Sequence, residues 1–388
     1  MLENKTKLLK IKIQRESLLK ALRFVQKIVP SNPQLPILSS LLFKLEKGKL
    51  LLSSTDLYFG IQSRVATTTN EEVEVAIPGH IFKEMVNSLK SETLEIVLES
   101  DRMKMKANGS VVSIPVQNPQ DYPEFPEIKK KKIELTRDVM SKIEKFVCFA
   151  AGVDQARPIL TTLLIKLNKD GLKAVATDGF RLTVLDIPEA KGETDEEILI
   201  PSRYFSEVFS IAEQSDVEKV IIYSEEELKQ LRFEVGESDV YVRLIEGEYP
   251  PYEKIIPENF SVSLVIDGEK FHQELKRAAI LAKEASNIIT IKSDNTSLEN
   301  DKNQKATQLI IESKSLSRGS YLGKIPLLTD VSEDIQISFN VNYLLDFLNS
   351  CKPGVVEMKF NDSLKPAMFA VDEEDNFKYI VMPFRVNQ

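Results

Sequence analysis

The chain has 388 residues, of which 42% are hydrophobic and 28% charged, which is the composition of a folded globular protein rather than a disordered one. Its formal net charge of −8, taken over the whole chain, argues against a nucleic-acid partner, because neutralising phosphates requires lysine and arginine. No apolar run is long enough to cross a bilayer. The two cysteines have no CxxC spacing and indicate neither a disulfide framework nor a zinc site. We therefore expect a cytoplasmic protein without membrane contact, metal or cofactor.

The predicted elements follow one order in each third of the chain. In the first third an alternating strand begins near Leu9 and leads into an amphipathic helix, strand-rich segments follow, and a second helix precedes two closing strands. The helices of the three thirds are predicted at 15–27 and 80–90, at 136–146 and 202–214, and at 269–284 and 341–352. We expect loops at 122–126 and 249–253, an exposed connector at 129–132 and a polar loop at 293–305.

Two segments of the chain repeat one sequence. Residues 36–56 and 158–178 align without a gap at an offset of 122 positions, with 11 identical residues in 21. Each copy ends in a Thr-Asp pair, Thr55-Asp56 and Thr177-Asp178. Agreement at this level indicates a duplicated domain, and fainter matches near 269–284 and 339–344 indicate a third copy.

The repeat predicts an α+β fold of three similar domains, each with two helices packed on antiparallel sheets. We place the domains at 1–130, 131–257 and 258–388. Units of this size are large enough to bury a core of their own.

Positive charge is concentrated in the predicted helices. The six helical windows carry 15 basic and 10 acidic residues, so the rest of the chain holds all the net negative charge. In three helices the cations recur at spacings of three, four or seven positions, opposite an apolar stripe. These cations are Lys20, Arg23, Lys27, Lys83, Lys90, Lys276 and Lys283. They form either ordinary solvated helix faces or a shared, mildly basic face suited to sequence-independent phosphate contact.

No arrangement typical of catalysis is present in the sequence. His80 and His272 lack a neighbouring nucleophile, and no phosphate-binding loop or metalloprotease motif occurs. Asp56 and Asp178 could be paired carboxylates, but an aspartate after a strand more often caps a turn by accepting backbone N–H bonds. We therefore expect a protein without catalytic residues.

Six blocks of sequence carry a resemblance to a known family. They are LPILSSLL (35–42), SSTDLYFGI (53–61), RPILTTLL (157–164), VATDGFRL (175–182), FNVNYLLDFL (339–348) and YIVMPFRV (379–386). Together they resemble the bacterial DNA polymerase III beta subunits, the replicative sliding clamps, and the resemblance extends from about Ile11 to the end.

The resemblance implies a head-to-tail homodimeric ring of six domains that encircles double-stranded DNA independently of its sequence and catalyses nothing. The helix cations named above, with Arg157 and Arg203, would face the DNA. The implied partners are a clamp loader, the DNA polymerase III alpha subunit and other proteins with clamp-binding peptides. The implied location is the bacterial cytoplasm, in association with the nucleoid.

The resemblance also implies a groove for short peptides between the second and third domains, an apolar trough with a few polar groups. Its residues would be Leu160, Thr177, Gly179, Arg181, Leu182, Pro250, Ile255, Asn340, Tyr343, Leu364, Pro366, Val381, Met382, Pro383, Phe384 and Arg385. Phe180 stands where many relatives carry histidine.

The acidic composition, and loops without the basic residues that many relatives carry, motivate an alternative function. The same fold could serve as a peptide-binding scaffold that does not bind DNA. Loader-dependent association with DNA distinguishes the clamp from the scaffold.

Overall fold

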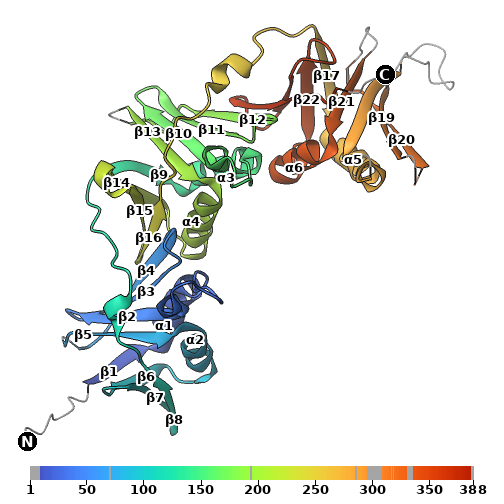
Figure 1. Ribbon diagram of the computed structural model, residues 1–388. Helices are drawn as coiled ribbons and strands as arrows, with labels where there is room; N and C mark the ends of the chain where they lie inside the picture. Colours follow the sequence, from blue (N-terminus) through green and yellow to red (C-terminus); the bar gives the residue numbers. More distant parts are fainter. Residues whose placement is uncertain are drawn as a thin grey trace, which may run out of the picture. The chain divides into compact units, whose positions relative to one another are not determined.

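The computed structural model describes residues 9–69, 71–192, 195–284, 286–294, 308–315, 317, 319–329 and 335–385. Within these ranges the chain forms six α-helices and 24 β-strands (Figure 1). Their contacts divide the chain into two compact units: residues up to Arg137 with Glu207–Leu244, and Asp138–Ser206 with the residues from Ile245 onward. No helix in these ranges is long and apolar enough to span a membrane.

The first unit contains an eight-stranded antiparallel sheet, in the order β5-β2-β3-β4-β16-β15-β14-β9, and a four-stranded sheet, in the order β1-β6-β7-β8. Its strands are β1 (Leu9–Gln14), β2 (Ser40–Glu46), β3 (Lys49–Thr55), β4 (Phe59–Ala66), β5 (Val73–Pro78), β6 (Thr93–Leu98), β7 (Arg102–Ala107), β8 (Ser110–Pro115), β9 (Lys131–Thr136), β14 (Lys219–Glu225), β15 (Gln230–Val235) and β16 (Ser238–Arg243). Its helices are α1 (Arg15–Val25), α2 (Gly79–Ser88) and the second half of α4 (Ser202–Gln214).

The second unit repeats this arrangement, with an eight-stranded sheet in the order β13-β10-β11-β12-β24-β23-β22-β17 and a four-stranded sheet in the order β20-β19-β18-β21. Its strands are β10 (Thr162–Asn168), β11 (Gly171–Thr177), β12 (Arg181–Ile187), β13 (Glu196–Pro201), β17 (Val262–Asp267), β18 (Ile288–Asp294), β19 (Gln308–Ser315), β20 (Gly319–Pro326), β21 (Gln336–Asn340), β22 (Val355–Phe360), β23 (Ala367–Val371) and β24 (Phe377–Val381). Its helices are α3 (Arg137–Phe146) from Asp138 onward, the first half of α4, α5 (Gly268–Ala282) and α6 (Val341–Cys351).

All six predicted helices are confirmed, because each has an apolar stripe with a helical period. In α1, for example, Leu18, Leu22 and Val25 are fully buried, while the cations Lys20 and Arg23 are exposed. Burying one such aliphatic side chain stabilises the fold by about 1.5–3 kcal/mol. The apolar stripe therefore determines which face of the helix packs on the sheet.

Each helix belongs to a local series of one strand, the helix and three further strands. The first series is β1, α1, β2, β3 and β4, and the second is β5, α2, β6, β7 and β8. The sequence-based expectation of only two closing strands is wrong, because it omits β8. In that strand Ile114 alone is buried, so the strand lacks the apolar alternation by which strands are recognised.

The last strands of two series pair with each other to form each eight-stranded sheet. Strand β4 pairs antiparallel with β16 in the first unit, and β12 pairs antiparallel with β24 in the second. Strands β8 and β20 are also last strands of their series. Within the described parts of the chain, each of them pairs on one side only.

The repeated Thr-Asp pairs form identical turns. Asp56 Oδ1 accepts the backbone N–H groups of Tyr58 and Phe59 at 2.9 and 2.8 Å, just after β3. Asp178 Oδ1 accepts the corresponding groups of Phe180 and Arg181 at 2.8 and 2.9 Å, just after β11. The turn-capping interpretation is confirmed, and both carboxylates are used in shaping the backbone.

Two expected loops differ from the structure. The expected connector at 129–132 is partly a strand, because β9 begins at Lys131. The expected polar loop at 293–305 begins inside β18, which includes Ser293 and Asp294, and its remaining residues lie outside the described ranges.

Candidate functional site

The turn between β11 and β12 is held rigidly by its own side chains. Thr177 Oγ1 donates to the carbonyl of Arg181 at 2.6 Å and accepts the N–H of Gly179 at 3.0 Å. Gly179 has φ +93°, a conformation that L side chains rarely adopt. A Cβ atom there would also lie 3.3 Å from Nη1 of Arg157, the far end of a flexible side chain that can move aside, so the backbone conformation is what favours glycine.

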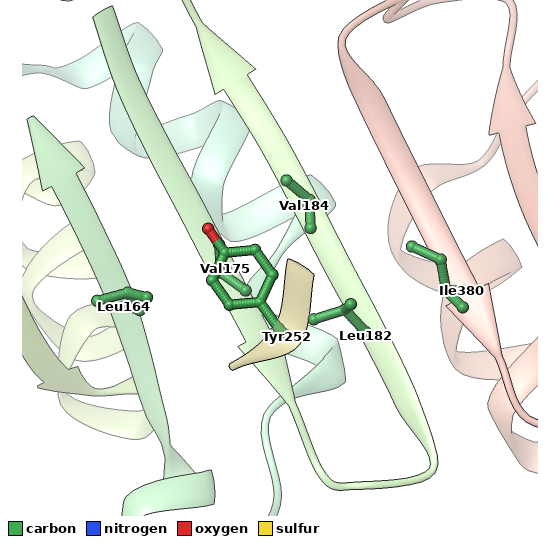
Figure 2. Close-up of a cluster of buried hydrophobic side chains, with 6 residues drawn as sticks. All are labelled: Leu164, Val175, Leu182, Val184, Tyr252 and Ile380. Atoms are coloured by element: carbon green, nitrogen blue, oxygen red, sulfur yellow. The ribbon is translucent and has the colours of Figure 1, made fainter. Parts of the chain in front are cut away.

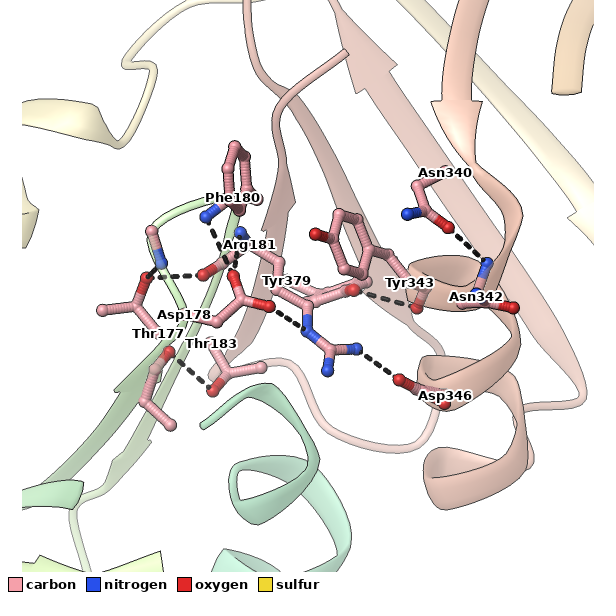
Figure 3. Close-up of polar contacts among 12 residues, drawn as sticks. Thr177, Asp178, Phe180, Arg181, Thr183, Asn340, Asn342, Tyr343, Asp346 and Tyr379 are labelled. Atoms are coloured by element: carbon pink, nitrogen blue, oxygen red, sulfur yellow. Dashed lines mark hydrogen bonds and ion pairs between the residues drawn. The ribbon is translucent and has the colours of Figure 1, made fainter. Parts of the chain in front are cut away.

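Arg181 links this turn to helix α6. Its side chain is only 9% exposed, its Nε lies 3.1 Å from Asp178 Oδ2, and its Nη1 lies 2.7 Å from Asp346 Oδ2 (Figure 3). The guanidinium carbon is 4.9 Å from the ring centre of Tyr343, in cation–π contact. Two carboxylates and a ring therefore fix the position of one buried cation.

Helix α6 is positioned at its start. Asn340 is its N-cap, and its Oδ1 accepts the N–H of Asn342 at 3.0 Å. The hydroxyl of Tyr379 in β24 donates to the carbonyl of Tyr343 at 2.9 Å. Burial raises the pKa of Tyr379, so this hydroxyl keeps its proton and remains a donor at neutral pH. These bonds hold Tyr343 beside Arg181.

A cluster of buried apolar side chains lies on the sheet beside the turn. It contains Leu164, Val175, Leu182, Val184, Tyr252 and Ile380 (Figure 2). Leu182 and Ile380 are opposite each other across the pairing of β12 with β24, so the cluster includes both sides of this pairing. Tyr249 packs against the cluster, and burial raises the pKa of its hydroxyl. The cluster gives the sheet an apolar surface beside polar Arg181.

The C-terminal segment continues past β24 along the same turn. Val381 lies opposite Arg181, and the N–H of Met382 donates to the carbonyl of Phe180 at 2.9 Å. The side chains of Met382 and Phe384 are 40% and 48% exposed. The segment therefore presents large apolar groups to solvent directly beside the turn.

A cavity of about 200 Å³ opens between the turn and α6. The predicted groove residues that line it are Leu160, Arg181 and Tyr343. Phe180 also lines it and stacks on Tyr343, with ring centres 6.5 Å apart and an interplanar angle of 19°. The cavity thus combines an aliphatic side, an aromatic pair and a fixed cation, which suits an extended peptide with an apolar anchor.

The other predicted groove residues do not line this cavity. Thr177 and Leu182 are buried beneath the turn, and Pro250 accepts the N–H of Tyr252 at 2.7 Å. Gly179 and Asn340 shape the backbone as described above, and Val381 is buried in β24. Pro366 and Pro383 are half-buried, whereas the remaining residues are exposed: Ile255, Leu364, Met382, Phe384 and Arg385.

Sequence reasoning missed three residues of this site. Asp346 is not among the predicted groove residues, but it is an ion-pair partner of Arg181. Phe180 was noted as a departure from relatives, but it forms part of the cavity wall. Arg157 was predicted to face DNA and lines the same cavity. Only Phe180 carried a signal in the sequence, its position inside the repeated turn.

Comparison with known proteins identifies the family. The profile of the DNA polymerase III beta subunit N-terminal domain matches residues 9–126, that of the central domain matches residues 134–251, and that of the C-terminal domain matches residues 253–385. The chain belongs to the DNA polymerase III beta subunit family. The predicted family and its three-domain clamp fold are confirmed.

Beta subunit relatives match along nearly their whole length. The beta sliding clamps of Synechocystis sp. and Streptomyces coelicolor are each 26% identical to the chain, covering 97% and 98% of it and 100% of the relatives. The crystal structure of the DNA polymerase III subunit beta from Pseudomonas aeruginosa is 25% identical, with a TM-score of 0.87, and covers 97% of this chain and 100% of that chain. These matches support a replicative sliding clamp and do not favour the DNA-independent scaffold.

Most of the cations predicted to face DNA are exposed. The exposed ones are Lys20, Arg23, Lys27, Lys90, Arg157, Arg203, Lys276 and Lys283, and Lys83 is half-buried. Lys20 and Lys27 lie 3.7 Å from Glu16 and Glu207, in ion pairs that are well exposed on both sides. Pairs of this kind are weak and leave the cations available to a phosphate.

Proposed function

We propose that two copies of this chain close head to tail into a ring that encircles duplex DNA and tethers the replicative polymerase to it. The pairing of last strands supports this proposal. Both eight-stranded sheets form where the last strands of two series pair, β4 with β16 and β12 with β24. If β8 of each copy paired with β20 of the other, the same pairing of last strands would occur twice more and would close the ring.

Strands β8 and β20, each of which pairs on one side only within the described residues, have the properties of an interface. Val111 in β8 and Leu322 in β20 are 60% and 56% exposed. An exposed strand edge with apolar side chains is a template for pairing with another chain. A head-to-tail dimer would cover both edges.

Contact with DNA would be electrostatic and independent of sequence. The helix cations, with Arg157 and Arg203, would face the phosphates, although the chain as a whole is acidic. Such a surface makes weak, salt-sensitive contacts that allow sliding. The ring would hold its DNA by topology, would be opened by a clamp loader, and would catalyse nothing itself.

The cavity beside Arg181 would be part of the peptide groove that recruits partners. We assign to this groove the sixteen residues predicted from the sequence, and add Phe180 and Asp346. An extended peptide from the polymerase alpha subunit, the clamp loader or a repair protein would place an apolar side chain against Leu160 and Met382.

We also propose domains at 1–130, 131–257 and 258–388, and a cytoplasmic location in association with the nucleoid.

Two measurements test the proposal. The solution mass should be twice the 44.0 kDa of one chain. After loading by its clamp loader, the protein should stay on circular DNA and be lost when the DNA is linearised. Equal loss from circular and linear DNA would rule out encirclement.

A further inference from the structure

A second, larger cavity lies in the first unit, away from the site described above. It has a volume of about 680 Å³, within the range of roughly 300–1,000 Å³ that is typical of small-molecule sites. One wall is helix α1, and others are the end of α4, the turn between β15 and β16, and the adjoining ends of β3 and β4. Its basic residues are Lys20, Arg23, Lys49 and Arg64.

Positive charge dominates this cavity. Among the described residues that line it, Glu237 is the only acid beside four cations. Arg64 is neutralised, because its guanidinium is paired with the buried carboxylate of Asp239. Three cations and one acid remain.

Two of those cations have no ion-pair partner in the part of the chain that the structure describes. Lys20 lies 3.7 Å from Glu16, but both side chains are more than 70% exposed, so the pair contributes little. Neither Arg23 nor Lys49 has an ion-pair partner among the described residues, and both are exposed. Their charges are therefore free to bind an anion.

In the second repeat, acidic residues neutralise the cations at the equivalent helix positions. Lys142 and Lys145 stand 122 positions after Lys20 and Arg23, on helix α3. Lys142 Nζ lies 2.9 Å from Glu189 and 3.2 Å from Glu374, and Lys145 Nζ lies 2.7 Å from Glu373. In that copy, three glutamates balance the two lysines.

The first copy lacks these acids. At the offset of 122 positions Thr67 stands in place of Glu189. The turn between β15 and β16 contains Gly236 and Glu237, where the turn between β23 and β24 holds four acids in a row, Asp372 to Asp375. Compared with the second copy, the first copy therefore has the cations with fewer balancing acids, and a cavity beside them.

We propose that this cavity binds the phosphoryl group of a nucleotide. The guanidinium of Arg23 can donate two parallel hydrogen bonds to one phosphate, and Lys49 adds a second cation. Ala21, Val65 and Val217 provide an apolar part of the wall for a planar base. A compact cavity with dense positive charge suits a nucleotide better than an acidic peptide, whose charges are spread along an extended chain.

The nucleotide can come from two sources, a free nucleoside triphosphate or the terminal nucleotide of a DNA strand. Binding of either ligand at this cavity needs no closed ring, so it does not depend on the proposed function. The experiment therefore measures binding to the unloaded protein. Retention on circular DNA is measured separately, so that failure of one proposal is distinguishable from failure of the other.

The test is fluorescence anisotropy with two probes, labelled deoxythymidine triphosphate and a labelled 5′-phosphorylated oligothymidylate. Arg23→Ala with Lys49→Ala should weaken binding about tenfold or more, because it removes two charge-assisted contacts. Lys142→Ala with Lys145→Ala removes the same charge from the neutralised copy, and should change affinity by less than about twofold. Glu237→Gln should tighten binding severalfold, since it removes the only acid in the described wall.

If triphosphate binding is lost in the Arg23→Ala, Lys49→Ala variant but not in the Lys142→Ala, Lys145→Ala variant, the result would support a nucleotide site whose ligand is a free nucleotide. The same loss confined to the oligothymidylate would support it with a DNA end as the ligand. Three results would overturn the proposal: no binding of either probe to the wild-type chain, equal loss in both double variants, or no change with Glu237→Gln. Preferential binding of a glutamate-rich peptide with the same sensitivity would overturn the assignment to nucleotides.

Discussion

Arg181 and Asp346 are joined by a 2.7 Å ion pair, although 165 positions separate them in the sequence. The pair connects the start of β12 to the middle of α6, and Asp178 holds the other side of the same guanidinium. Because the cation is buried and fixed at both ends, it sets the distance between the turn and the helix. That distance defines the cavity lined by Phe180 and Tyr343.

Arg181→Ala should lower the free energy of unfolding by about 2–4 kcal/mol, because it leaves two carboxylates facing each other without a cation. Arg385→Ala is the matched control, since Arg385 is exposed and should change stability by less than about 0.5 kcal/mol. Urea denaturation monitored by circular dichroism measures both. Equal stability of the two variants would contradict a structural role for the ion pair.

Met382→Ala combined with removal of residues 383–388 should abolish binding of a polymerase-derived peptide while the dimer persists. The change removes the exposed apolar groups beside the turn but leaves β24 intact. Calorimetric titration of the peptide measures the effect. Ile280→Ala removes a side chain that is 71% exposed on α5, outside the groove, and should leave affinity unchanged. Wild-type affinity in the truncated variant would refute this placement of the groove.

Lys83→Glu with Lys90→Glu should impair loading onto DNA, most visibly at low salt, where phosphate contacts contribute most. These lysines lie on or just after α2 and do not line the proposed nucleotide cavity. Lys129→Glu with Lys130→Glu makes the same charge change in the segment before β9 and should load normally. If both double variants load alike, the helix cations do not face the DNA.

Leu322→Arg should convert the dimer to a species with the 44.0 kDa mass of one chain. An arginine on β20 would place a charge in the proposed contact with β8. Leu328 has the same 56% exposure but lies outside β20, so Leu328→Arg should remain dimeric. Analytical ultracentrifugation distinguishes the two masses, and a dimeric Leu322→Arg protein would exclude this interface.

The thiols of Cys148 and Cys351 should resist alkylation in the folded protein at pH 8. Burial raises the pKa of both, and Glu144 adds to the effect at Cys148, so the reactive thiolate is scarce. Mass spectrometry after iodoacetamide treatment measures this, with denatured protein as the control. Rapid labelling of the native chain would show that the thiols are more accessible than the structure indicates.

The elements that depend on local pattern were predictable from the sequence. The apolar stripe of α1 and the aspartate of each Thr-Asp turn act through neighbours a few positions away, so their effect is visible in the sequence itself. Strand β8 was missed because its single buried side chain, Ile114, leaves no alternation. Its role depends on which strand pairs with its edge, and the residues of β8 itself do not indicate that partner.

The candidate site was predictable only where the family resemblance supplied it. Leu160, Arg181 and Tyr343 were named from matching motifs, and the structure brings them to one cavity. Asp346 was not predicted as part of the site, because nothing local reveals that a buried arginine lies opposite it. Contacts between residues so far apart depend on strand pairing across the sheet, which single-sequence reasoning does not determine.

The pairing of β12 with β24 has a consequence for how the chain is made. Strand β12 leaves the ribosome long before its neighbour, because β24 lies far downstream of it in the chain. At about 5–20 residues per second, the roughly 190 residues between them take roughly 10 to 40 s to synthesise. Throughout that interval the edge of β12 has no partner, and β4 waits in the same way for β16, so both edges are open to wrong pairing during translation.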